Sequence, residues 1–142
     1  VGAVLQKKWS IEASKYFKNV LIQEQHHVHK QDVPSGTSYD LALSMEGMHT
    51  GDNLASHSIE TKNSKEDKVE LTETLLNDIK IYSLRYGEDL ARQMVDFNED
   101  FEGLHIDHNS YSRDAYVRGI QLSLLEYNKL SGFCIGLELI ME

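Results

Sequence analysis

Apolar residues near the start of the chain recur at intervals that suit one face of a helix. Lys7, Lys8 and Lys15 lie between them and Lys18 follows the last, at positions where their charges can point to solvent. The pattern predicts a helix over roughly residues 2–18. The apolar residues with this spacing are Val4, Leu5, Trp9, Ile11 and Phe17.

Short β-branched or alternating runs farther along the chain predict strands. Val20-Leu21-Ile22 is followed by polar residues up to His26, which places polar side chains at the C-terminal end of that strand. Residues 79–84 alternate between apolar and polar positions, and the runs 94–97 and 104–108 are of the same kind. Together these runs predict a mainly antiparallel sheet.

Turn and cap signals place two further helices. Pro34-Ser35-Gly36-Thr37 predicts a turn, because proline fixes φ and glycine permits left-handed backbone. Thr37 is the expected N-cap of a helix from about Ser38 to Met45. A helical stripe over 112–128, followed by Gly132, predicts a last helix. The simplest packing is one α+β domain over residues 1–142, with a mixed, mainly antiparallel sheet and helices packed on one face.

The part of the chain from 46 to 78 is polar and shows no periodicity before Leu71, so no element is predicted there. Its acidic residues are expected to form a solvated surface; they are Glu66, Asp67, Glu70 and Glu73. The chain as a whole carries a formal net charge of -9, which argues against nucleic acid or an acidic membrane surface as a partner.

A lone cysteine and the absence of long apolar runs bear on the compartment. Cys134 lies in an apolar stretch, where we expect a buried thiol that behaves as a small hydrophobe, and a single cysteine fits a reducing compartment. No run of about 18 apolar residues is present to span a bilayer. These features predict a cytoplasmic protein without a membrane partner.

The residues with the clearest chemistry run from Glu24 to Thr37. Three imidazoles and the Lys30 ammonium lie within the five residues 26–30, directly before the turn. Histidine can exchange a proton near neutral pH, so a proton-transfer role for His26 or Lys30 is reasonable. Backbone N–H groups at a turn that enters a helix bind carboxylates, and the hydroxyls of Ser35 or Thr37 could add a donor.

Other interpretations of these residues remain open. Histidines in a loop are often merely solvated. His27 and His29 alternate along the chain and could share a face with an acid from elsewhere to bind a metal, although paired cysteines and His-Glu-x-x-His are absent. The hydroxyl of Ser35 lacks the Gly-x-Ser-x-Gly context of a serine hydrolase. His105 and His108 are expected to be residues of the sheet rather than ligands.

Taken as an ordered string, Glu24-x-His26-x-x-x-Lys30-x-Asp32-x-Pro34-Ser35-Gly36-Thr37 resembles the signature of the dihydrodipicolinate reductase family at eight specified positions. A second stretch, His108-Asn109-Ser110-Tyr111-Ser112-Arg113 followed by Ala115 and Gly119, resembles the family's segment that enters its last helix. Val1-Gly2-Ala3-Val4 resembles the start of the family's substrate domain. The chain departs from the family at Ser38, where the signature has Ala, at Arg85-Tyr86-Gly87, which replaces Arg-Gly-Gly, and at Ala91-Arg92-Gln93, which replaces Gly-Glu-His.

The resemblance implies an architecture and an activity. The family joins an N-terminal Rossmann domain to a C-terminal α+β domain that binds substrate and assembles a homotetramer through its sheet. This chain resembles only the C-terminal domain, because its nine glycines nowhere form Gly-x-Gly-x-x-Gly. We therefore expect the Rossmann domain to be absent from this chain, a homotetramer or dimer formed through the sheet, and no reduction by this domain alone.

The resemblance also implies a reaction and roles for residues. The whole enzyme is a cytoplasmic oxidoreductase of diaminopimelate and lysine biosynthesis, 4-hydroxy-tetrahydrodipicolinate reductase, which uses NADPH or NADH bound mainly by the Rossmann domain. Carried over residue by residue, His26 and Lys30 become the catalytic, proton-handling pair. The small dicarboxylate heterocycle would be held by His27, Lys30, Ser35, Gly36 and Thr37, with no cofactor-binding residue and no metal ligand in this chain.

Two interpretations compete with the reductase. The first is a non-catalytic ligand-sensing or assembly domain that is derived from the same fold. The second is the histidine-based metal-binding module described above.

Overall fold

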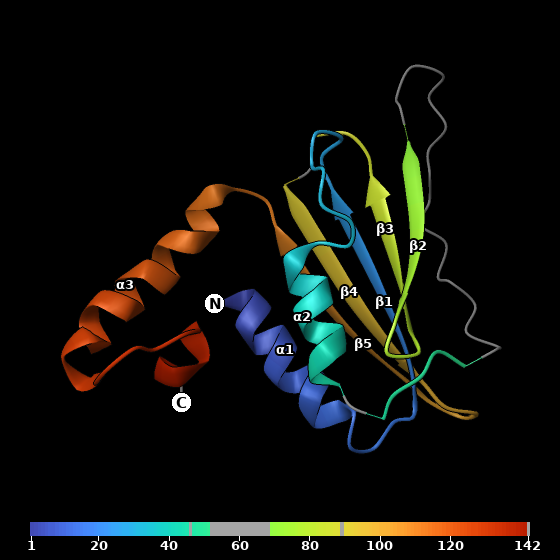
Figure 1. Ribbon diagram of the computed structural model, residues 1–142, viewed down its shortest axis with the longest axis horizontal. Coiled ribbons are helices and arrows are strands. Elements are labelled where there is room, and N and C mark those ends of the chain that lie inside the picture. The colour runs from blue at the N-terminus through green and yellow to red at the C-terminus, as the bar shows by residue number, and fades with distance from the viewer. Residues whose placement is uncertain (46, 52–68, 89, 142) are drawn as a thin grey trace.

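The computed structural model describes residues 1–45, 47–51, 69–88 and 90–141, and the strands among them form one sheet in the order β2-β3-β1-β4-β5 (Figure 1). β1 pairs with β3 in parallel, while the pairs β1 with β4, β2 with β3 and β4 with β5 are antiparallel. The predicted mixed, mainly antiparallel sheet is therefore confirmed. The strands are β1 (Asn19–His26), β2 (Glu70–Leu76), β3 (Ile79–Arg85), β4 (Ala91–Asn98) and β5 (Gly103–Ser110).

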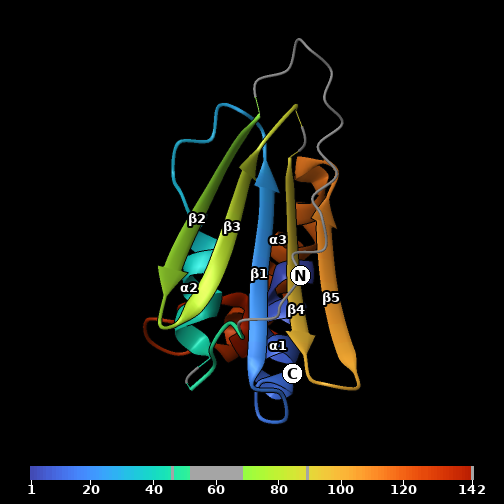
Figure 2. The same cartoon turned by 90° about the vertical axis from the view of Figure 1, so that its right-hand side faces the viewer.

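Two helices, α1 (Gly2–Ala13) and α2 (Gly36–Ser44), cover one face of this sheet (Figure 2). On the opposite face, called the open face below, none of the described residues forms a helix. The third helix, α3 (Val117–Glu126), extends away from the sheet on the far side of α1 (Figure 1). It packs chiefly against three short 3₁₀ segments, η1 (Arg113–Tyr116), η2 (Tyr127–Lys129) and η3 (Leu137–Ile140). Helices on one face of the sheet are thus correct for α1 and α2, while α3 does not follow this arrangement.

The hydrophobic core fills the space between the sheet and the two covering helices. Val20 and Ile22 of β1 lie beside Phe97 and Val95 of β4 in the register of the sheet, and all four are fully buried. The helices contribute further apolar side chains to the same cluster, namely Ala13, Leu41, Ala42 and Met45. Side chains on a strand alternate between the two faces of a sheet, so every second residue of these strands points into the core. This alternation explains the period of two in their sequences.

Toward the C-terminal end of β1 the same covered face changes from apolar to polar. Glu24 pairs in register with Ser83 of β3 and Gln93 of β4, and His26 pairs with Arg85. Glu24, Ser83, Arg85 and Gln93 are all buried. Buried polar side chains require hydrogen-bond partners. Glu24 and Arg85 bond each other and the connection between β1 and α2, while Gln93 bonds Ser38 of α2.

The face of α1 that meets the sheet differs from the one predicted. The helix ends at Ala13 rather than near residue 18, and its buried residues are Gln6, Ser10 and Ala13. Trp9 is 55% exposed. The reason lies in Gln6, whose amide donates to the backbone oxygens of Gln93 at 2.7 Å and Ile106 at 2.8 Å. Gln6 therefore faces the sheet, because its amide satisfies backbone groups there.

Two further expectations need correction. β2 was not predicted, and it occupies an edge where Leu71 and Leu75 are exposed. Cys134 is exposed rather than buried. Glu70 and Glu73 are exposed as expected, while Glu66 and Asp67 fall outside the described residues. Among the described residues, none of the helices combines the length and apolarity that crossing a bilayer requires.

Candidate active site

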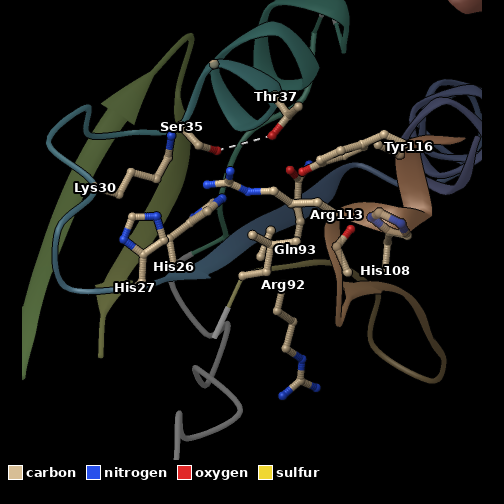
Figure 3. Close-up of a pocket in the computed structure, with 15 residues that line it drawn as sticks. His26, His27, Lys30, Ser35, Thr37, Arg92, Gln93, His108, Arg113 and Tyr116 are labelled. Carbon is tan, nitrogen blue, oxygen red and sulfur yellow. Dashed lines mark hydrogen bonds between the residues drawn. The ribbon is translucent and has the colours of Figure 1, made fainter. Parts of the chain in front are cut away.

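A cavity of about 460 Å³ opens where β1 ends and α2 begins. Its volume is within the range of small-molecule sites, about 300–1,000 Å³. The residues that the sequence singled out come together on one wall of this cavity (Figure 3). They are His26, His27, Lys30, Ser35, Gly36 and Thr37.

The N-terminus of α2 forms part of the wall of this cavity. The helix begins at Gly36, and its cap is Ser35, whose hydroxyl accepts from the Ser38 N–H at 3.4 Å. The expected cap Thr37 is therefore wrong: Thr37 lies inside the first turn, with its hydroxyl 3.2 Å from that of Ser35. The first N–H groups of a helix have no partner within the helix and carry its positive dipole end. This wall can bind a carboxylate.

Lys30 supplies a positive charge beside that helix end. Its Nζ donates to both carboxylate oxygens of Asp32 at 2.7 Å. The Lys30 side chain is 22% exposed and that of Asp32 is 57% exposed. The hydrogen bond from Lys30 lowers the pKa of Asp32 below its ordinary value. The ammonium thus lies at the cavity with an exposed partner that a ligand carboxylate can replace.

His26 is held from behind by Glu24. The His26 Nδ1 atom contacts Glu24 Oε2, and the Glu24 side chain is fully buried. Burial alone raises the pKa of Glu24, but the neighbouring His26, Arg85 and Ser83 side chains and the Ser35 N–H together lower it to about 2. Glu24 is therefore ionised at neutral pH. An ionised carboxylate can only accept hydrogen bonds, so this contact favours the ring tautomer that carries its proton on Nδ1.

The guanidinium of Arg85 completes the buried network beneath the loop. It donates to Glu24 Oε1 at 3.0 Å and to the backbone oxygens of Asp32 at 2.7 Å and Lys30 at 3.3 Å. Glu24 Oε1 also accepts from the Ser35 N–H at 3.0 Å. The loop that carries Lys30 and leads to α2 is thus fixed by one buried ion pair.

Sequence reasoning missed the opposite wall of the cavity. This wall includes Arg92 and Gln93 of β4, His108 of β5, and Arg113 and Tyr116 of η1. Arg113 extends from this side into the space between the two walls (Figure 3). The sequence predicts His108 only as a residue of the sheet. The available signal was strand alternation, which puts His108 on the same face as Ile106 and Ser110.

His108 packs closely against the start of α1. A Cβ added to Gly2 would lie 2.3 Å from His108 Nε2, so the helix approaches the ring because this position has no side chain. Burial lowers the pKa of His108 below its ordinary value. The neutral ring is therefore favoured on this wall.

Residues 91–93, where the chain departs from the family signature, form the start of β4. Ala91 pairs with Ser110, and Arg92 forms an ion pair with Asp107 at 2.8 Å. The Gln93 side-chain oxygen accepts from the Ser38 hydroxyl at 3.2 Å, which joins β4 to the first turn of α2. β4 therefore keeps its register with these side chains in place.

The structure does not assemble a metal site from the clustered histidines. The rings of His27 and His29 lie 6.3 Å apart between centroids. Within the described part of the chain, no group of three or more His, Cys, Asp or Glu residues could hold a metal ion.

Comparisons with known proteins point to the same family as the sequence motif at residues 24–37. The family described as "Dihydrodipicolinate reductase, C-terminus" matches residues 2–140. A protein of Listeria welshimeri named 4-hydroxy-tetrahydrodipicolinate reductase is 36% identical over 146 aligned positions, which cover 100% of this chain and 52% of the relative. A protein of the same name from Lactococcus lactis subsp. cremoris is 36% identical and covers 97% of this chain and 51% of the relative. The chain thus spans about half the length of these curated relatives.

A solved structure has the same fold. It is described as dipicolinate-bound dihydrodipicolinate reductase from Paenisporosarcina sp. TG-14, and it superposes with a TM-score of 0.77 at 28% sequence identity. The superposition covers 99% of this chain and 51% of that chain.

Proposed function

This chain belongs to the family of dihydrodipicolinate reductase C-terminal domains, and from this premise we propose that it is the substrate-binding and catalytic domain of a 4-hydroxy-tetrahydrodipicolinate reductase of diaminopimelate and lysine biosynthesis. One observation carries the proposal. A single cavity brings together Lys30, His26 and the N-terminus of α2. Carboxylate anchors and a proton donor are what the reduction of a dicarboxylate ring requires.

The proposed ligand is a small heterocycle with two carboxylates. One carboxylate would accept from the backbone N–H groups of Gly36 and Thr37, with the Ser35 or Thr37 hydroxyl as a further donor. The other would pair with Lys30 and His27, in place of the present contact between Lys30 and Asp32. The described relative that superposes on this chain binds dipicolinate, a ring of this class.

The proposed chemistry of this domain is the transfer of a proton. Reduction of a conjugated imine leaves electron density on the ring that must be protonated. His26 and Lys30 both line the cavity, so either can deliver that proton. The hydride would come from NADPH or NADH. The nine glycines of the chain nowhere form a dinucleotide-binding fingerprint, so we assign none of its residues to the nucleotide.

We further propose that the open face of the sheet associates with a second copy, giving a homodimer or homotetramer. None of the described helices covers this face (Figure 2), although Leu21 and Leu84 near its centre are buried. It carries Leu71 and Leu75, which are 59% and 63% exposed. Burying such side chains against a copy would remove apolar surface from water. Sedimentation of the chain at several concentrations tests this, and a monomer at all of them would contradict it.

The proposal for the site is tested by dipicolinate, pyridine-2,6-dicarboxylate, as a thermal-shift ligand. A ligand at about 100 times its dissociation constant stabilises a folded protein by about 2.7 kcal/mol. We expect the melting temperature to rise for the wild type and for Lys8→Ala, an exposed lysine of α1 away from the cavity. Lys30→Ala should abolish the rise. A folded wild type with no shift at millimolar dipicolinate would contradict the proposal.

One observation favours a second candidate, a ligand-sensing or assembly domain without catalysis. Gln93, which lines the cavity, stands where the family signature has His. Both candidates would bind dipicolinate, so ligand binding does not separate them. An assay of reduction by the complete protein, nucleotide domain included, does: turnover supports the reductase, and tight binding without turnover supports the sensor.

A further inference from the structure

We propose that Glu24 is a positioning residue of this site, which fixes the ring nitrogen through which His26 exchanges protons and anchors the loop that carries Lys30. This inference rests on the proposed function of the cavity. It concerns a buried side chain that lies behind the cavity wall rather than in contact with a ligand.

One carboxylate oxygen of Glu24 contacts the ring of His26. The atoms in contact are Glu24 Oε2 and His26 Nδ1. Both atoms are buried, and neither has a hydrogen bond to any other group of the described residues. Because Glu24 is ionised, it accepts from an Nδ1–H whether the ring is neutral or protonated. The proton that the ring gains or loses must therefore be on Nε2. A carboxylate that orients the far nitrogen of a histidine serves the same purpose in the Ser-His-Asp triad.

The other carboxylate oxygen of Glu24 holds the loop between β1 and α2. Glu24 Oε1 accepts from the Ser35 N–H and from Arg85, each at 3.0 Å. Arg85 in turn donates to the backbone oxygens of Lys30 and Asp32. One buried pair thus holds both ends of the segment 30–35. The position of the Lys30 ammonium relative to the α2 N-terminus depends on it.

The charged and imidazole side chains that line the cavity with His26 include no carboxylate that could replace Glu24. Arg85 is its register partner on β3, Lys30 and His27 come from the following loop, and Arg113 comes from η1. These groups are cations or imidazoles. Glu24 is therefore the acceptor for His26 Nδ1 in this network.

Replacement of Glu24 by Gln gives a sharp expectation, because an amide has only one acceptor oxygen. If that oxygen keeps the two donors at the Oε1 position, the NH₂ group faces His26 Nδ1 as a donor. The neutral ring must then carry its proton on Nε2. We expect the tautomer of His26 to change from Nδ1–H in the wild type to Nε2–H in Glu24→Gln.

The experiment is a long-range ¹H–¹⁵N correlation spectrum of the ¹⁵N-labelled chain at about pH 9, where unperturbed imidazoles are neutral. The His26 signals are identified by their loss in His26→Gln. Asp96→Asn is the matched control: Asp96 is a second buried carboxylate that contacts a histidine, His105, on the open face of the sheet. It should leave the His26 tautomer unchanged. A purely structural role for Glu24 would lower stability without moving this signal.

The outcomes separate the inference from the proposed function. A wild-type His26 with its proton on Nε2 overturns the inference, whether or not the variant folds, and so does an unchanged tautomer in Glu24→Gln. If the wild type does not bind dipicolinate, the proposed function fails even when the tautomer is as expected. In the complete protein we expect Glu24→Gln to lower kcat by about 100-fold, the scale of general acid catalysis, with a smaller effect on KM.

Discussion

Lys30 places its Nζ atom 2.7 Å from both carboxylate oxygens of Asp32, so the cation that the site offers to a dicarboxylate is already paired with an anion. Lys30 lines the cavity, and Asp32 is the more exposed member of the pair. A ligand carboxylate must displace this partner before it can use the full charge of Lys30. The strength of binding therefore depends on how weak the resident ion pair is.

Removing the resident anion should strengthen ligand binding. Exposed ion pairs contribute about 0–1 kcal/mol, so Asp32→Asn should tighten dipicolinate binding by up to about fivefold, as measured by titration calorimetry. The backbone oxygen of Asp32 remains available to Arg85. Asp40→Asn is the control, because Asp40 forms a comparable exposed pair with Lys7 at 2.6 Å. Weaker binding in Asp32→Asn would mean that Asp32 orients Lys30 rather than competes for it.

The ionised Glu24 should make stability depend on pH in the acid range. Its pKa is lowered from 4.5 to about 2 in the folded chain, so it stabilises the fold above about pH 4.5, and this contribution is lost as pH falls toward 2. At neutral pH the contribution is roughly 3 kcal/mol. The difference in free energy of unfolding between wild type and Glu24→Gln should therefore shrink between pH 4.5 and 2. Denaturant titrations across this range measure it, and a constant difference would argue against the assignment.

The close approach of α1 to β5 should make Gly2 intolerant of a side chain. An added Cβ would overlap the His108 ring at 2.3 Å, so Gly2→Ala should cost about 1–3 kcal/mol of stability and shift the NMR signals of His108. Gly36→Ala is the control for stability, because a Cβ there meets nothing within 4 Å. Equal melting temperatures for the two variants would show that the helix start adjusts without cost.

Replacing the buried Gln6 of α1 by an apolar residue should destabilise the protein, although apolar side chains usually stabilise a buried position. Gln6→Leu would leave the backbone oxygens of Gln93 and Ile106 without their side-chain donor. A buried acceptor left without a partner costs about 1–3 kcal/mol, so the free energy of unfolding should fall by that order. Lys8→Leu on the exposed side of the same helix should change it by about 0.5 kcal/mol or less. A more stable Gln6→Leu would show that water or a rearranged side chain satisfies those oxygens.

The strands that line the core were predictable, because burial on one face imposes a period of two. Val20, Ile22, Val95 and Phe97 carry that signal directly. β2 was missed because it is an edge strand, where Leu71 and Leu75 are exposed and the alternation gives no contrast with a polar loop. The buried face of α1 was mispredicted for the opposite reason: Gln6 is polar and buried.

The candidate site was predictable in part because its residues lie close together in sequence. His26, His27, Lys30 and the turn at Ser35 belong to one connection between a strand and a helix, and all of them line one cavity. The pairing of Glu24 with Arg85 joins residues 61 positions apart, and a sequence pattern does not reveal such contacts. The same holds for Arg113 and His108, which the topology of the sheet brings to the opposite wall.

The central claim is that the cavity at the end of β1 binds a dicarboxylate ring, and amide chemical-shift mapping with dipicolinate tests it most directly. We expect saturable shifts concentrated at the backbone amides of Gly36 and Thr37 and at the loop that carries Lys30. Shifts confined to other surfaces, such as the hollow at Tyr127 and Phe133, or no shifts at millimolar dipicolinate, would contradict the account.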